Sequence, residues 1–236
     1  MKPDYLLLVF LLVLGMYFSV STKKLTVGAS LTGGVIGFLL FAGIGYGGLL
    51  MMASFFIIAV IATAWKLKDK VLAGLSETNK GRRSAFQVLA NAGVSAVIAI
   101  IALFYPSNQL MWEVMLASSF AAATSDTVSS ELGNVYGKKY YHIITWQKDL
   151  RGENGVVSLE GTLAGIAGST FIALIYAVCF GSLTYVFLIL IAGFLGNIVD
   201  SILGATLERK YMLNNNLVNF LNTLFAALIA WVFLCN

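Results

Sequence analysis

The 236-residue chain is 59% hydrophobic and 11% charged, with a mean hydropathy of +0.87. Soluble domains carry about 25% charged residues, so these values exclude a water-soluble protein, a disordered chain and a secreted disulfide scaffold. The apolar runs are each close to the roughly 20 residues that cross a bilayer, and alternating barrel strands are absent from the pattern. The composition therefore predicts an all-α polytopic membrane protein, with residues 1–236 forming a single integral membrane domain.

Eight apolar stretches predict eight transmembrane helices. In chain order they cover 4–21, 25–42, 46–65, 86–105, 110–132, 157–180, 183–205 and 216–234. The glycine-rich part, 25–65, leaves two interpretations open: two helices that turn near Gly43–Gly48, or one helix with a re-entrant piece, which would give seven spans. The first stretch is interpreted as a retained helix because lysines follow it directly and no small-residue cleavage site is evident.

Positive charge gathers in the odd-numbered connections between these helices. Fourteen of the fifteen lysines and arginines fall there, and only Lys2 lies on the other side. The positive-inside rule places these connections in the cytoplasm and both termini outside. We therefore expect a multi-pass protein of the cell membrane with two cytoplasmic loops, at 66–84 and 133–155. The charge pattern gives no indication of a nucleic-acid partner.

Ionisable and amide side chains occur near the cytoplasmic ends of several predicted helices. Burying an ionisable group in a span costs roughly 2.5–3.5 kcal/mol, so such residues are candidates for function. Capping, snorkelling or helix–helix hydrogen bonding could explain each residue taken singly. Their accumulation at one depth favours a polar cavity open to the cytoplasm. The residues are Arg83, Gln87 and Asn91 on one helix face, and Asp126, Glu131, Glu160, Asp200, Asn215, Asn219 and Asn222.

Asp126 and Asp200 are the carboxylates that we expect to face each other from neighbouring helices. Glu131 lies roughly 140° around the helix from Asp126, so these two would not chelate one ion from one regular helix. Two carboxylates with amide oxygens and water suit Mg²⁺. His142 is the only histidine, which excludes a catalytic histidine dyad, and Cys179 and Cys235 are expected to be free thiols.

The loop that begins at Gly133 brings cations and glycines together. Glycines allow a ligand to approach the backbone, lysines hold phosphates as point charges, and a helix N-terminus offers N–H groups to an anion. Beside a carboxylate-bound metal, this composition favours phosphoryl transfer. The candidate phosphate ligands are Lys138, Lys148, Arg151, Asn154 and Ser158. For Lys138, the positive-inside rule alone is an alternative explanation.

Five separated motifs cover most of the chain from residue 81 to residue 220. They are GRR at 81–83 with QVLAN at 87–91, SDT at 125–127 with SELG at 130–133, GENGVVS at 152–158, VDSILGAT at 199–206, and NNNLVNF at 214–220. These motifs resemble the membrane family that includes plant phytyl phosphate kinases and the animal transmembrane protein nineteen. The stretch from Asp126 to Thr162 is also similar to CTP-dependent phytol and dolichol kinases, although Ser125 stands where their pattern has glycine.

The resemblance implies a kinase that converts a phytyl, geranylgeranyl or polyprenyl monophosphate to the diphosphate, with CTP as donor and Mg²⁺ as cofactor. The prenyl tail would lie among apolar helices, with the bilayer as a partner and a homo-oligomer left open. It implies catalytic roles for Asp126, Glu131, Lys148 and Asp200. Asp126 and Asp200 would hold the metal, and Glu131 would be an outer ligand or bind a second metal. The implied nucleotide and phosphate ligands are Arg82, Arg83, Asn91, Ser130, Lys138, Lys148, Arg151, Asn154, Ser158, Asn215 and Asn219.

Two other functions use similar groups. A small ion-coupled transporter also needs intramembrane carboxylates and glycine-broken helices, although it needs a site reachable from both faces. A cytidylyltransferase that makes a CDP-lipid would differ only in which phosphorus is attacked. Both functions stay open as alternatives to the kinase.

Overall fold

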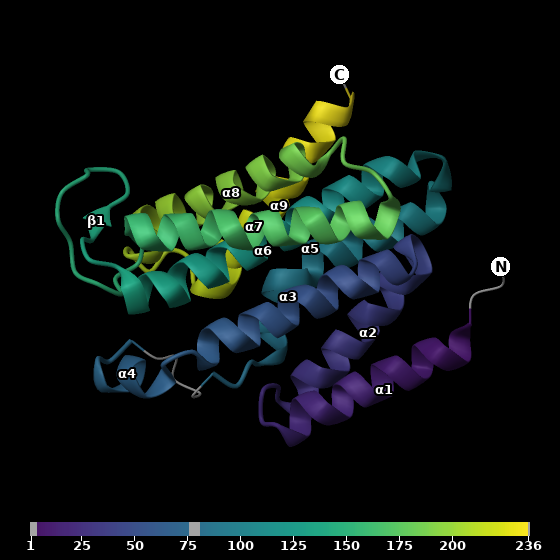
Figure 1. Cartoon of the computed structure of the whole chain (residues 1–236), viewed down its shortest axis with the longest axis horizontal. Coiled ribbons are helices and arrows are strands. Elements are labelled where there is room, and N and C mark those ends of the chain that lie inside the picture. Colours follow the sequence, from purple (N-terminus) through teal and green to yellow (C-terminus); the bar gives the residue numbers. More distant parts are fainter. Residues whose placement is uncertain (1–3, 76–80, 236) are drawn as a thin grey trace.

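The computed structural model describes residues 4–75 and 81–235. Lys2 and Lys80, and with Lys80 the segment 76–80 of the loop predicted at 66–84, therefore lie outside the described residues. Eight long helices run back and forth through the described part of the chain (Figure 1). They are α1 (Tyr5–Ser21), α2 (Val27–Ile44), α3 (Tyr46–Ala64), α5 (Ala85–Phe104), α6 (Gln109–Tyr136), α7 (Leu159–Phe180), α8 (Val186–Leu203) and α9 (Asn215–Cys235).

Short elements fill the connections between the long helices. They are α4 (Leu67–Leu72), the 3₁₀ turn η1 (Pro106–Asn108), the strands β1 (Tyr141–His142) and β2 (Val156–Val157), and the π-helical turn η2 (Gly204–Glu208). The strands pair antiparallel, with Tyr141 opposite Val157. The helix α6 continues to Tyr136, three residues past Gly133, where the second loop was predicted to begin.

The predicted helical stretches agree with the observed helices to within a few residues. The glycine-rich part forms two helices, because Gly45 adopts a φ of +85° between α2 and α3, a conformation that L side chains rarely adopt. Among the described residues, six helices are long and apolar enough to cross a membrane: α2, α3, α5, α7, α8 with η2, and α9. The chain is thus a helical polytopic membrane protein.

The central element is α6, which packs against α3, α5, α7, α8 and α9. Its segment from Val114 to Ser125 is buried throughout, whereas α1 packs on α2 at the periphery and exposes most of its apolar side chains. Small residues allow the close approach to α7: a Cβ atom on Gly161 would lie 2.8 Å from Ser129 O, and one on Gly165 would lie 3.0 Å from Ser125 Oγ. Gly161 and Gly165 thus serve close helix packing, whereas a Cβ on Gly33 would have nothing within 4 Å.

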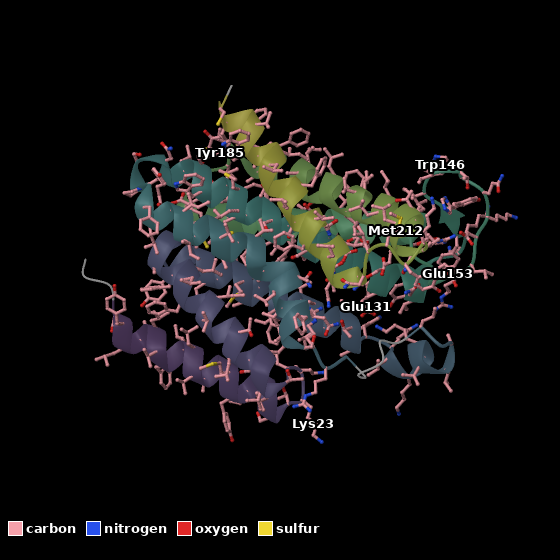
Figure 2. All side chains as sticks on the ribbon, turned by 180° about the vertical axis from the view of Figure 1, so that it is seen from behind. Lys23, Glu131, Trp146, Glu153, Tyr185 and Met212 are labelled. Carbon is pink, nitrogen blue, oxygen red and sulfur yellow. The ribbon has the colours of Figure 1, made fainter. Side chains whose placement is uncertain are left out.

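The connections 22–26, 65–75 with 81–84, 137–158 and 209–214 lie together, and we call this the basic end. In Figure 1, α4 and β1 mark this end, while α1 begins and α9 ends at the opposite end. Figure 2 shows Lys23, Trp146 and Met212 toward the basic end and Tyr185 at the other. The described cations therefore share one end of the bundle, and the assignment of that end to the cytoplasm stays a prediction.

Candidate active site

A polar cavity of about 230 Å³ opens among α5, α6, α8 and α9 at the basic end. The loop before α7 forms another part of its wall. Five carboxylates line it, against a single arginine, Arg83. The carboxylates are Asp126, Glu131, Glu153, Asp200 and Glu208. The cavity is therefore anionic, although its lining also contains the amide and hydroxyl groups that a phosphate could use.

Asp126 on α6 and Asp200 on α8 meet in this cavity, with their carboxyl groups within hydrogen-bonding range of each other. The preceding helical turns explain the contact, because α8 approaches α6 there through a glycine. A Cβ atom on Gly196 would lie only 2.7 Å from Ala122 Cβ. Gly196 and Ala122 each precede one of the aspartates by four residues, so the close approach brings the two carboxyl groups face to face.

Amide groups from α9 surround Asp200. Asn222 Nδ2 donates to Asp200 Oδ1 at 3.4 Å. Asn219, with its amide oriented so that the nitrogen faces Asp200, donates to the same oxygen at 3.2 Å. Asn219 and Asn215 both line the cavity. The structure therefore brings Asn219 and Asn222 of α9 to one of the two predicted metal ligands.

Arg83, two residues before α5, and Gln87 and Asn91 in the first turns of α5 all line the cavity. Gln87 and Asn91 both lie on the cavity side of α5, whereas Arg83 lies before the helix, in a β-bridge with Leu25, so the prediction of one helix face for all three residues is wrong for Arg83. The start of α5 is fixed by a capping box in which Gln87 N donates to Ser84 Oγ and Ser84 N donates to Gln87 Oε1. Arg83 lies over the ring of Phe55 at 5.6 Å and acts electrostatically on Asp126. Arg83 is therefore placed to balance part of the negative charge.

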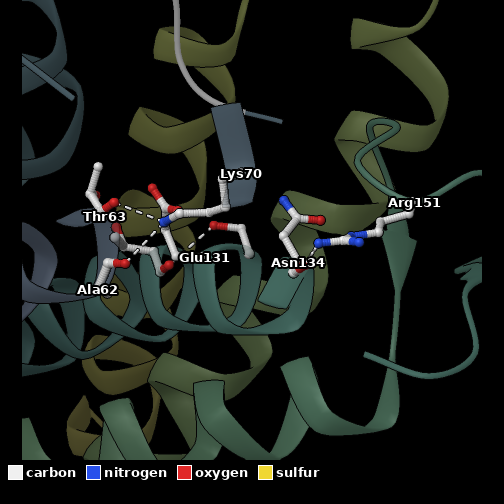
Figure 3. A network of polar contacts seen from close by, with 8 residues as sticks. Ala62, Thr63, Lys70, Glu131, Asn134 and Arg151 are labelled. Atoms are coloured by element: carbon white, nitrogen blue, oxygen red, sulfur yellow. Dashed lines mark hydrogen bonds and ion pairs between the residues drawn. The ribbon is translucent and has the colours of Figure 1, made fainter. Parts of the chain in front are cut away.

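Glu131 lines the cavity but is held from outside it by Lys70 (Figure 3). Lys70 Nζ donates to Glu131 Oε2 at 2.5 Å and also to Ala62 O and Thr63 O, at 3.1 and 2.8 Å. Only 1% of Lys70 is exposed. The predicted role of Glu131 as an outer or second metal ligand remains a prediction, and the structure adds the fact that a lysine of α4 occupies one of its oxygens.

The glycine loop 152–155 closes over the η2 turn. Gly155 has a φ of +72°, and a Cβ atom there would lie 2.3 Å from Ala205 Cβ. Arg209 secures the loop, since Nε donates to Asn154 O at 2.6 Å and Nη2 to Asp149 Oδ2 at 2.8 Å. The Leu150 N–H and then Arg209 hold the pKa of Asp149 below its usual value. Asn154 and, at the start of α7, Ser158 line the cavity as a result.

Four predicted phosphate ligands do not line the cavity. Arg82 Nε donates to Leu25 O at 3.2 Å, and Arg151 Nη2 donates to Asn134 O (Figure 3). Lys138 and Lys148 are exposed. The remaining predicted site residues line it, namely Arg83, Asn91, Asp126, Ser130, Glu131, Asn154, Ser158, Asp200, Asn215 and Asn219. For Lys138, Lys148 and Arg151, sequence spacing could not show that they lie away from the cavity, because the conformation of their loop depends on contacts of Arg209 and Gly155.

Glu208 is a cavity residue that the sequence analysis did not select. A regular α-helix would place it about 80° around from Asp200. The η2 turn contains an i to i+5 hydrogen bond, from Arg209 N to Gly204 O at 3.2 Å, and the extra residue turns Glu208 back toward the face of Asp200. Glu208 accordingly acts electrostatically on both aspartates. The sequence does place a carboxylate, Glu208, about two helical turns after Asp200. Only the π-turn, however, brings Glu208 onto the same face as Asp200.

The residues of the cavity fit Mg²⁺ as a pair of carboxylates rather than as a complete cage. Within 4–75 and 81–235, no group of three or more His, Cys, Asp or Glu is arranged to hold a metal ion. Magnesium is commonly bound by one or two carboxylates together with waters and substrate phosphates. Two neighbouring carboxylates in an anionic cavity match that donor set, because a divalent cation would offset their repulsion.

Comparison with known proteins agrees with this architecture. The family model described as integral membrane protein DUF92 matches residues 10–227. The uncharacterized membrane protein sll0875 of Synechocystis sp. is 35% identical over 199 residues, which are 83% of this chain and 77% of that protein. The uncharacterized membrane protein MJ0933 of Methanocaldococcus jannaschii is 36% identical over 201 residues, or 85% and 82% of the two chains. The chloroplastic protein VTE6 of Arabidopsis thaliana is 33% identical over 226 residues, or 90% and 67%. No solved structure matches the chain with significance. The chain therefore belongs to the DUF92 family of integral membrane proteins.

Proposed function

We propose that this protein is a membrane-embedded isoprenoid monophosphate kinase that uses a nucleoside triphosphate, CTP in the first instance, together with Mg²⁺. The observation that carries the proposal is the contact between Asp126 and Asp200 in an anionic cavity beside Arg83. The five motifs that resemble phytyl phosphate kinases supply most of the cavity wall. The similarity to VTE6, which extends over 90% of this chain, supports the same assignment.

The chemistry needs few groups from the protein. An oxygen of the prenyl phosphate attacks the γ-phosphorus of the nucleotide, the bond from that phosphorus to the β,γ-bridging oxygen breaks, and the nucleoside diphosphate leaves. The attacking oxygen is already anionic, so no general base is required. His142 is outside the cavity lining, and its Nδ1 accepts from Ile144 N at 3.2 Å.

Each part of the cavity has a role in this reaction. Asp126 and Asp200 would hold Mg²⁺, which supplies charge neutralisation of the transferring phosphoryl group. Arg83 would orient the acceptor phosphate, and Asn154 and Ser158 would contact the nucleotide phosphates from the glycine loop. Asn215 and Asn219 would help to shape the cavity.

The size of the cavity indicates which parts of the substrates it would enclose. Pockets that bury a drug-sized ligand measure roughly 300–1,000 Å³, more than the 230 Å³ present here. The cavity would therefore hold the phosphates, while the base remains at the rim and the prenyl chain lies along the apolar helices. In this arrangement the basic end faces the cytoplasm, where the nucleotide is available.

A panel of lipid phosphates and nucleotides tests the proposal. Purified protein in detergent with Mg²⁺ should convert phytyl or geranylgeranyl phosphate to the diphosphate and release CDP from CTP. Release of pyrophosphate would instead indicate a CDP-lipid-forming cytidylyltransferase. Absence of turnover with every prenyl phosphate and every nucleotide tested would contradict the kinase assignment and favour the transporter.

A further inference from the structure

Asn91 carries a buried, unpaired oxygen in the wall of the cavity. Its side chain lines the cavity although only 6% of the residue is exposed. Nδ2 donates to Gln87 O at 2.9 Å, whereas Oδ1 has no hydrogen-bond partner among the residues that the structure describes. Exchanging the two amide atoms would place Oδ1 against the Gln87 carbonyl oxygen, so the hydrogen bond fixes Oδ1 as the atom that is left without a partner. The group offered to a ligand is therefore an acceptor.

A buried acceptor without a donor needs a ligand that is a donor or a cation. A phosphate oxygen at pH 7 is also an acceptor, so it would repel Asn91 Oδ1. The orientation of Asn91 therefore argues against the predicted role of this residue in holding the acceptor phosphate. It favours a cation, for which neutral amide oxygens are common ligands.

The surroundings of Asn91 also favour a cation. Asp126 and Asp200 lie within hydrogen-bonding range of each other, and Glu208 acts electrostatically on both. Arg83 is the one basic residue in the cavity lining of the described chain, so the carboxylates there outnumber cations. A mixture of carboxylate and amide oxygens is the donor set of hard divalent cations, and thiolates and imidazoles are absent from this lining.

We propose that Asn91 Oδ1, Asp126 and Asp200 bind a hard divalent cation before any nucleotide enters the cavity. Glu208 stays at the edge of this site and raises the local concentration of cations. The cation site stands independently of the reaction, whereas the order of binding, cation first and nucleotide second, rests on the proposed function. Nucleotide phosphates would then meet a cavity whose negative charge is already reduced.

Titration of the purified full chain with Mn²⁺ in the absence of nucleotide tests this site. Mn²⁺ accepts the same oxygen ligands as Mg²⁺ and its free form is measured directly by electron paramagnetic resonance. We expect one bound Mn²⁺ that Mg²⁺ displaces. Changing groups that only orient metal ligands costs 10–100-fold in affinity, so Asp126→Asn and Asp200→Asn should weaken binding at least about 100-fold. Glu113→Gln, on the same helix as Asp126 but near its other end, should leave binding unchanged.

Two substitutions at Asn91 separate an oxygen ligand from a merely structural amide. Asn91→Leu removes the oxygen and should weaken Mn²⁺ binding at least about tenfold, by the same scale. Asn91→Asp keeps an oxygen and adds charge, so it should bind Mn²⁺ at least as tightly as the unmodified protein. Equal weakening by both substitutions would show that the oxygen is not a ligand and would overturn the role of Asn91. All variants are compared by size-exclusion profile and helical circular dichroism.

The outcomes also separate this site from the proposed kinase. Failure of the unmodified protein to bind Mn²⁺ without nucleotide would overturn the cation-first site, even if phosphoryl transfer were observed. Unchanged affinity in Asp126→Asn and Asp200→Asn would overturn the ligand assignment. Mn²⁺ binding that depends on these residues, without transfer to any prenyl phosphate, would support the cation site and contradict the kinase.

Discussion

Lys70 Nζ lies 2.5 Å from Glu131 Oε2 and links the short helix α4 to α6 at the basic end of the bundle. Both groups are removed from solvent, with 2% of the Lys70 side chain and 16% of the Glu131 side chain exposed. Two backbone carbonyls of α3 accept the other lysine protons. The connection between α3 and α5 thus supports the cavity from outside, through the contact of Lys70 with Glu131.

Lys70→Met should destabilise the protein more than an ordinary surface substitution does. Removing one partner of a buried ion pair leaves the other charge uncompensated, at a cost of about 3–5 kcal/mol. Adding Glu131→Leu to this variant should restore much of the stability. Thermal unfolding in detergent compares the variants, with exposed Lys68→Met as the control. A loss below about 1 kcal/mol for Lys70→Met would mean that the pair does not hold α4 in place.

Asp126→Asn and Asp200→Asn should each abolish phosphoryl transfer while the protein remains inserted and helical. A catalytic metal supplies several kcal/mol of transition-state stabilisation, so losing a metal ligand should lower kcat about 100-fold or more. Steady-state assays with saturating Mg²⁺ measure the effect, and Glu113→Gln provides the control. Wild-type activity in either aspartate variant would remove that residue from the catalytic site.

Gly155→Ala should lower activity through the glycine loop. The φ of +72° is strained for alanine, and the added Cβ would lie 2.4 Å from Ala205 N, so the loop must move away from η2. We expect a higher KM for the nucleotide, because Asn154 moves with the loop. Gly28→Ala is the matched control, since a Cβ there has nothing within 4 Å. Equal kinetics for the two variants would show that the loop position does not matter.

The anchor between Asp149 and Arg209 should weaken only in acid. The Leu150 N–H and Arg209 lower the pKa of Asp149 in the folded state. Its contribution to stability is therefore present above the unfolded pKa of about 3.9 and is lost as pH falls through the lower folded value. The Tm difference between the unmodified protein and Asp149→Asn should be present at pH 6 and shrink below pH 4. A difference that stays constant to pH 3 would contradict the anchor.

Hydropathy was sufficient to locate the long helices, because each apolar run must cover one bilayer thickness. It could not find α4, whose six residues are too short to show a period. Nor could it extend α6 to Tyr136, since the last turns of that helix face a polar cavity and resemble a loop in composition. The sequence left open whether residues 25–65 form two helices or one helix with a re-entrant piece. The backbone conformation of Gly45, with a φ of +85°, answers this question.

The site was predictable where regular helices determine it. Asp126 and Asp200 follow from the direction of their helices, and Gln87 and Asn91 follow from a spacing of four residues. Arg83 lies before the helix, where helical spacing does not apply. Nothing in the sequence distinguished Lys70 from the neighbouring lysines, because the positive-inside rule already accounts for all of them. Glu208 depends on a π-turn, and the positions of Lys148 and Arg151 depend on how the loop folds.

Isotope transfer from CTP tests the central claim most directly. With Mg²⁺ and geranylgeranyl phosphate, CTP labelled at the γ-phosphorus should pass its label to the lipid, and CTP labelled at the α-phosphorus should not. The proposed kinase predicts labelled geranylgeranyl diphosphate and unlabelled CDP in the first reaction. Label that reaches the lipid only from the α-position, or from neither position, would contradict it.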